Sequence, residues 1–111
     1  MSKRRRQTPR TTAPRIKAGC IEAVKQEWKI RQGLRLLGLT LDVHLIDCGQ
    51  AVSYHWQFRA ADTERLVLDY WPGSGTTLDA AKNKGRVSGP WEAARLAGQV
   101  AGSLRSPSGQ K

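Results

Sequence analysis

The chain has 111 residues, two cysteines and a net charge of +10, from 19 Lys and Arg against 9 Asp and Glu. This length fits a single domain, and two distant cysteines are too few for the disulfide scaffold of a small secreted protein. The basic start is not followed by the apolar stretch of a signal peptide, and no apolar run approaches the length of a membrane span. We therefore expect a cytoplasmic protein without membrane attachment.

The positive charge is unevenly distributed. Residues 1–35 contain eleven Lys and Arg against two acids, and residues 82–111 contain six against one, whereas residues 36–81 contain two against six. The excess in the first third goes beyond what solubility requires, so a polyanion is the expected partner. The alternative is a solvated charge run without a ligand.

Residues 1–14 are predicted to be a disordered basic arm. They include three Thr and two Pro but no apolar residue able to anchor the segment in a core. Such arms stay unfolded until they meet phosphate. Residues 105–111 are expected to be a disordered tail, which leaves 15–104 as a single α+β domain.

Residues 15–37 are predicted to form a helix, with Pro14 near its first turn and Gly38 as its stop. The apolar residues at the spacing of a buried stripe are Ile21, Val24, Trp28 and Leu34. The residues expected to form a basic ridge on another face are Lys25, Lys29 and Arg35.

Strands are predicted from strict alternation of apolar and polar residues. The first covers 39–48, the second 52–59 and the third 66–71, where Pro72 and Gly73 end it. The aromatic residues that share the apolar side of the second strand are Tyr54, Trp56 and Phe58, which favours a core over a stacking platform for bases. Trp71 instead points to the polar side.

Residues 76–78 are expected to extend the sheet briefly. The segment 79–89 is polar and basic, and a second helix is predicted over 90–104. Ser88, Pro90 and Glu92 suit a helix start, since they supply a polar cap, a first-turn proline and an acid at the positive end. The predicted fold is α+β, with a helix, a three-stranded antiparallel meander and a helix (α-β-β-β-α).

This order of elements is similar to that of the double-stranded-RNA-binding domain. The segments that carry the resemblance are the basic face of 15–37, the meander 39–71, the Lys and Arg residues of 82–86 and the Ala-rich run 93–97. The resemblance implies that both helices and the lysines before the second helix contact phosphates and 2′-hydroxyls across the grooves. The linker from 71 to 90 is longer than in that family.

The run Asp69-Tyr-Trp-Pro-Gly-Ser-Gly-Thr76 also resembles a strand end found in small uncharacterised proteins of phages and prophages, over roughly residues 52–87. The resemblance implies a mobile-element origin and the cytoplasm of a bacterial host. From the residues alone, Pro72 and Gly73 end a strand and turn the chain.

The expected function is that of a small basic nucleic-acid-binding accessory protein, non-enzymatic and without a cofactor or metal, which binds RNA or DNA through backbone and shape. The residues expected to contact phosphate are Lys3, Arg4, Arg5, Arg6, Arg10, Arg15, Lys25, Lys29, Arg35, Lys82, Lys84 and Arg86. The oligomeric state is left open.

An alternative function is interaction with a host protein complex, such as defence or transcription machinery. The residues of the contact face would be His55, Arg59, Asp69 and Trp71. A further alternative is a small metal-dependent nuclease that uses Asp42 and His44, although polar residues on the outer face of a strand are ordinary.

Two other kinds of site are less well supported by the sequence. A zinc site would need Cys20, His44, Cys48 and His55, but the cysteines are not paired at finger spacing. A phosphate loop over 73–77 lacks the lysine and the following helix that a P-loop requires.

Overall fold

The computed structural model describes residues 15–105, so the predicted arm 1–14 and residues 106–111 of the predicted tail lie outside the described residues. Its elements are β2 (Arg15–Ile16), α1 (Ala18–Leu36), β3 (Leu39–Asp47), β4 (Ala51–Ala60), β5 (Leu66–Trp71), β6 (Thr76–Asp79), β7 (Lys84–Arg86) and α2 (Pro90–Arg105). No helix within 15–105 is both long and apolar enough to cross a membrane.

The predicted α-β-β-β-α architecture is wrong, because the sheet is mixed and has six strands. The strands follow the order β2-β4-β5-β6-β7, and β3 is a further neighbour of β4 outside this order. β2 runs parallel to β4, and every other pairing is antiparallel. Residues 15–16, predicted to be the start of the helix, form the strand β2 instead. β6 lies where a brief extension of the sheet was expected, and β7 lies in the polar basic segment for which no strand was predicted.

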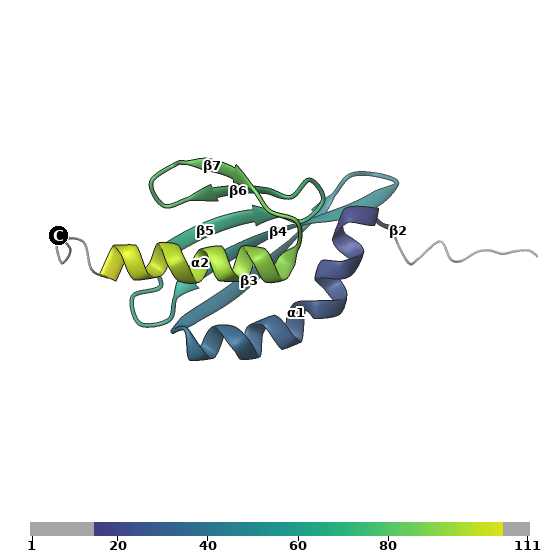
Figure 1. The fold of residues 1–111 in the computed structure, drawn as a ribbon. Coiled ribbons are helices and arrows are strands. Elements are labelled where there is room, and N and C mark those ends of the chain that lie inside the picture. The colour runs from purple at the N-terminus through teal and green to yellow at the C-terminus, as the bar shows by residue number, and fades with distance from the viewer. Residues whose placement is uncertain (1–14, 106–111) are drawn as a thin grey trace, which may run out of the picture.

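Both helices cover the same face of the sheet, and the other face carries no helix (Figure 1). The core lies between the two layers. α1 contributes Ala23, Ile30 and Leu34 to the buried cluster, whereas α2 contributes only alanines to it, at 93, 94, 97 and 101. Because alanines are small, α2 can lie close to the sheet.

The aromatic side chains at the centre of this core are those that alternation assigned to it. Trp56 and Phe58 are buried, and both pack edge to face, with Trp56 5.7 Å from Tyr70 and 6.1 Å from Phe58 between ring centroids. Tyr54 is only partly buried. The pairing of β4 with β5 shifts register between Phe58 and Arg59, and with this shift both Val67 and Leu68 join the core.

The predicted buried stripe of α1 is wrong apart from Leu34. Ile21, Val24 and Trp28 are 44%, 39% and 58% exposed. The side chains that face inward are instead Cys20, Ala23, Ile30 and Leu34. One residue of helix turns the direction of a side chain by about 100°, so a small rotation of the helix decides which set is buried.

A close contact at the start of α1 accounts for this rotation. A Cβ added to Gly19 would lie 2.7 Å from the carbonyl oxygen of Gly73 and 2.9 Å from that of Pro72. The next residue, Cys20, is fully buried, and its Sγ lies 3.6 Å from the Oγ of Ser53. The helix therefore enters the fold with its small residues against the turn that follows β5.

The run from Asp69 to Thr76 has a structural role in this turn. The N–H groups of Ser74 and Gly75 donate to the carbonyl of Trp71, at 3.1 and 2.8 Å. Gly75 has a φ of +79°, and a Cβ on it would lie 2.8 Å from the Val87 carbonyl oxygen. As predicted, β5 ends just before Pro72, and the turn connects the sheet to both α1 and the segment before α2.

The start of α2 is at Pro90, as predicted. The hydroxyl and the backbone N–H of Ser88 both donate to the Glu92 carboxylate, at 2.7 and 2.6 Å. These two bonds hold the pKa of Glu92 below its usual value. The carboxylate therefore satisfies the backbone donor of Ser88, two residues before the helix begins, and fixes the segment that leads into it.

Replacing Gly19 with alanine should lower the free energy of unfolding by about 1–3 kcal/mol, because the helix or the turn must move to admit the Cβ. The matched control is Gly33→Ala in the same helix, where the nearest atom to the new Cβ, Cζ3 of Trp91, is 3.8 Å away. This control should gain about 0.5–1 kcal/mol, since glycine is unfavourable inside a helix. Urea denaturation measures both, and equal stability of Gly19→Ala and wild type would contradict the close approach.

Tyr70 should make the fold less stable at high pH. Burial, with a smaller electrostatic contribution from Cys20, raises the pKa of the phenol from 10.0 to about 12. Between these two values the unfolded chain loses this proton while the folded chain keeps it, so stability falls as pH rises, by about 2–3 kcal/mol in all. Denaturation of wild type and Tyr70→Phe between pH 9 and 12 tests this: the wild type should lose stability relative to the variant, and parallel curves would refute it.

Candidate functional site

The open face of the sheet carries two rows of side chains, because directly paired residues point to the same side. In the first row His44 pairs with His55, whose ring stacks on Trp71, and beyond Trp71 the pairs continue to Thr76 and Arg86. The residues of the second row, in strand order, are Asp42, Gln57, Asp69, Leu78 and Lys84. Both rows therefore run from β3 across β4, β5 and β6 to β7.

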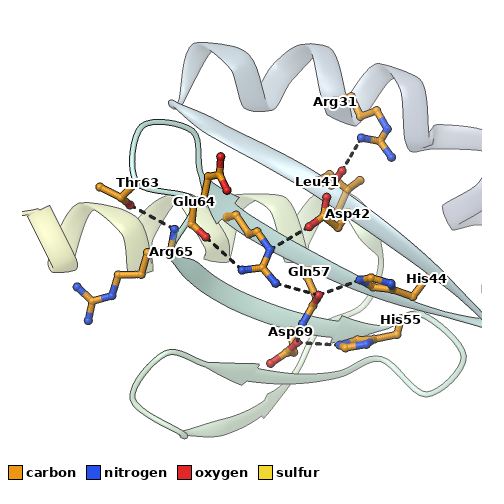
Figure 2. A network of polar contacts seen from close by, with 11 residues as sticks. Arg31, Leu41, Asp42, His44, His55, Gln57, Thr63, Glu64, Arg65 and Asp69 are labelled. Atoms are coloured by element: carbon orange, nitrogen blue, oxygen red, sulfur yellow. Dashed lines mark hydrogen bonds and ion pairs between the residues drawn. The ribbon is translucent and has the colours of Figure 1, made fainter.

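Gln57 is at the centre of a polar network on this face, and its bonds to His44 and Asp69 are drawn in Figure 2. Its Oε1 accepts from Nε2 of His44 at 2.8 Å and from Nη2 of Arg59 at 3.2 Å. Its Nε2 donates to Oδ1 of Asp69 at 3.1 Å. The guanidinium of Arg59 also pairs with Asp42 at 2.9 Å. The network thus joins three strands through side chains alone.

The partners determine which ring nitrogens carry protons. An amide oxygen can only accept, so His44 must donate through Nε2. His55 Nε2 lies 2.7 Å from Oδ1 of Asp69, and a carboxylate also only accepts, so His55 donates through Nε2 as well. Both neutral rings are therefore the Nε2–H tautomer, and each ring is held by one hydrogen bond at its tip.

Three rings on this face lie next to one another across neighbouring strands: His55 stacks on Trp71, and His44 is tilted by 35° against His55. His55 and Trp71 are parallel within 3°, with centroids 4.6 Å apart, and His44 lies 5.7 Å from His55 on the other side. The pair of His55 and Asp69 is largely shielded from solvent, with side chains 22% and 12% exposed. Shielding strengthens this contact relative to an ion pair at the surface.

The structure brings the four predicted residues of the contact face, His55, Arg59, Asp69 and Trp71, together on one surface. It adds Gln57 and His44 to them. Alternation placed Gln57 beside His55 and Arg59, but its role as the centre of the network depends on the register between strands, which the sequence does not show.

The predicted phosphate-binding residues fall into separate groups. Lys3, Arg4, Arg5, Arg6 and Arg10 lie outside the described residues, and Arg15 is exposed on β2. Lys25, Lys29 and Arg35 are exposed on α1, in the layer that covers the other face of the sheet. Lys82, Lys84 and Arg86 lie in the β6–β7 hairpin, at the far edge of the sheet from β3 (Figure 1). The structure therefore does not join the bases of α1 and those of the hairpin into one surface.

The loop of the β6–β7 hairpin is held by Asp79. Its Oδ1 accepts from the N–H of Asn83 and of Ala81, both at 2.9 Å, and the bond from Asn83 is the main reason why the pKa of Asp79 is lowered. Lys82 adopts a φ of +71° in this loop. The ion pairs of Arg and Lys within 15–105 are Arg31 with Glu27 and Arg59 with Asp42, so Lys82, Lys84 and Arg86 have no ion-pair partner there.

The alternative sites are not assembled by the described residues. Cys20 is buried against Ser53 whereas Cys48 is exposed in the turn after β3, and within 15–105 no three potential ligands converge on a metal position. Residues 73–77 form a turn that leads into β6 rather than a helix.

Removing the carboxylate of Asp69 should cost about 1–3 kcal/mol of stability, because Asp69→Ala leaves the ring of His55 and the amide of Gln57 without their shielded acceptor. The matched control is Asp42→Ala, which breaks the more exposed pair with Arg59 and should cost less than about 1 kcal/mol. Thermal denaturation ranks the two. ¹⁵N NMR of the imidazoles should show Nε2–H at both histidines in wild type, and an Nδ1–H tautomer at His55 would contradict the network.

Comparison of the chain with models of protein families, with curated proteins and with solved structures finds no match in any of the three.

Proposed function

We propose that the protein binds single-stranded nucleic acid on the open sheet face, with the β6–β7 hairpin holding the phosphate backbone. The observation that carries this proposal is the register of the sheet. It places Arg86 in the row of His55 and Trp71, and Lys84 in the row of Gln57 and Asp69. Aromatic rings beside positively charged side chains are the usual combination in proteins that bind single-stranded nucleic acid.

The ring of Trp71 supplies the stacking surface. One side of the indole is covered by His55, and the neighbour in the row on the other side is Thr76, whose side chain is too small to cover an indole. A base that enters there extends the column of rings formed by His44, His55 and Trp71. Stacking of this kind tolerates any base.

The hairpin supplies the charge. Arg86 is two strands away from Trp71, or about 10 Å, within reach of the backbone of a nucleotide stacked on the indole. Lys84 lies two residues along the same strand and Lys82 lies in the adjoining loop. The three positively charged side chains thus follow one edge of the open face, where they can contact successive phosphates of a nucleic-acid backbone.

Two features favour a single strand, bound without reading its sequence. The Lys and Arg residues of α1 and those of the hairpin lie on different parts of the molecule. A single duplex therefore does not contact both groups, although the resemblance to the double-stranded-RNA-binding domain implies that it should. The polar groups of Gln57, Asp69 and the two histidine tips are bonded to one another, which leaves few groups to read base edges. Binding should then depend on backbone charge and stacking.

The test is a gel-shift series with single- and double-stranded RNA and DNA at two salt concentrations. The double variant Lys84→Ala/Arg86→Ala should weaken binding and reduce the salt slope by about 0.7 for each phosphate that the protein no longer neutralises. The matched control, Lys25→Ala/Lys29→Ala, removes the same charge from α1 and should change little. Trp71→Ala should weaken binding by the roughly 1–3 kcal/mol of one base stack.

Equal losses of affinity in the two double variants would show attraction to net charge alone and would contradict the proposed site. Tighter binding of duplex than of single strands would also contradict it. Trp71→Phe separates stacking from folding, since it keeps an aromatic ring beside His55 and should retain most of the affinity.

The second candidate function is interaction with a host protein, through the face formed by His55, Arg59, Asp69 and Trp71. A pull-down from nuclease-treated lysate distinguishes it: a partner retained by wild type and absent with Trp71→Ala, without nucleic acid, supports this alternative. The observation that favours a protein partner is that His55, Asp69 and Trp71 lie together on the open face, with Arg59 joined to them through Gln57.

A further inference from the structure

The two helices leave an apolar groove between them on the side away from the sheet. Its volume is about 310 Å³, and it is lined from α1 by Ile30, Gly33, Leu34 and Leu36 and from α2 by Trp91 and Arg95, among others. Trp91 is 47% exposed and Leu36 is 90% exposed. Apolar surface gathered in this way marks an interaction site more often than scattered single residues do.

The walls of the groove are fixed in position. The indole N–H of Trp91 donates to the amide oxygen of Gln26 on α1 at 3.3 Å, which holds the ring against the neighbouring helix. Gly33 on α1 faces this ring, and a Cβ added to Gly33 would lie 3.8 Å from Cζ3 of Trp91. The absence of a side chain at Gly33 is therefore what keeps the floor of the groove open.

The charges at the border of the groove are mostly positive. Arg95 lines it from α2, and Lys29 lies on the adjoining face of α1, one turn after Lys25. Within residues 15–105 no acid lines the groove: Glu27 pairs with Arg31 at 2.9 Å, and Glu92 accepts two hydrogen bonds from Ser88. An occupant with acidic residues beside its apolar stripe matches this border.

We propose that this groove binds an acidic amphipathic helix of a partner protein. The lining runs from Ile30 on α1 to Leu37 just after it, about 10 Å or two helical turns. That length accepts apolar side chains at positions i, i+3 or i+4, and i+7 of an incoming helix, the usual pattern of helix-in-groove recognition. Glu and Asp on its flanks pair with Arg95 and Lys29.

The border charges disfavour a second copy of this chain. Packing the groove of one molecule against that of another would bring Arg95 and Lys29 of each copy together, in a protein with a net charge of +10. Nucleic acid is disfavoured by the apolar lining. This inference is independent of nucleic-acid binding, since the groove is lined by the two helices, which cover the face of the sheet opposite to the open one.

The experiment uses the full chain with Trp28→Phe, which leaves Trp91 as the main reporter on the surface of the helices, and designed peptides of about five helical turns. One peptide carries leucines on one face and glutamates elsewhere. A second has lysine in place of every glutamate, and a third has the acidic composition scrambled so that no apolar face forms. Changes in Trp91 fluorescence and calorimetry give the affinities.

The acidic amphipathic peptide should bind at least about tenfold more tightly than either of the others. Gly33→Leu, which fills the groove, should weaken this binding by about tenfold or more, and Arg95→Glu should reverse the preference between the acidic and the basic peptide. The matched control carries alanine instead of phenylalanine at position 28, because Trp28 is exposed but lies about 140° around α1 from Gly33; it should leave the affinity unchanged.

Three results would overturn the proposal: no binding of the acidic amphipathic peptide, equal binding of the scrambled peptide, or a greater fall in affinity with Trp28→Ala than with Gly33→Leu. Circular dichroism establishes that Gly33→Leu is folded, and Gly33→Ala serves as a smaller substitution at the same position. Nucleic-acid binding by Gly33→Leu should equal that of wild type, so failure here and failure of the open face are distinguishable.

Discussion

The rest of the structure depends on a one-sided packing arrangement: two helices cover one face of the sheet, and water meets the other. A chain of this size has enough apolar side chains for one core layer, and α2 contributes to it chiefly through alanines. The second face must then satisfy its polar groups without a covering layer. It does so through Gln57, which bonds to three neighbours at once, and the same solution gathers the residues that can bind a ligand.

Alternation in the sequence was sufficient to predict which side of each long strand faces the core. Trp56 and Phe58 are buried and His55 lies on the open face, because a period of two assigns every residue of a strand once the buried side is known. The helix was harder. Ile21 and Val24 have the right spacing for a core, but the contact of Gly19 with the turn at Gly73 rotates them outward, and a contact between segments more than 50 residues apart leaves no local signal.

The extra strands show a second limit of local patterns. β7 consists of a lysine, a glycine and an arginine and so has no alternation of apolar and polar residues, and β6 was expected only as a brief extension of the sheet over 76–78. Their pairing is what brings Lys84 and Arg86 onto the open face. The candidate site was thus half predictable: its rings and acids follow from the pattern, whereas its bases depend on strands that only the folded chain reveals.

β7 is also the last strand of the sheet, so its outer backbone groups have no strand beside them in the described part of the chain. Exposed strands of this kind are templates for unwanted sheet-to-sheet aggregation, and lysine and arginine are among the residues that natural proteins use to prevent it. Lys84 and Arg86 therefore keep separate molecules apart by mutual repulsion. Whatever neutralises them also removes that protection, which ties the solubility of the protein to the ionic composition around one short strand.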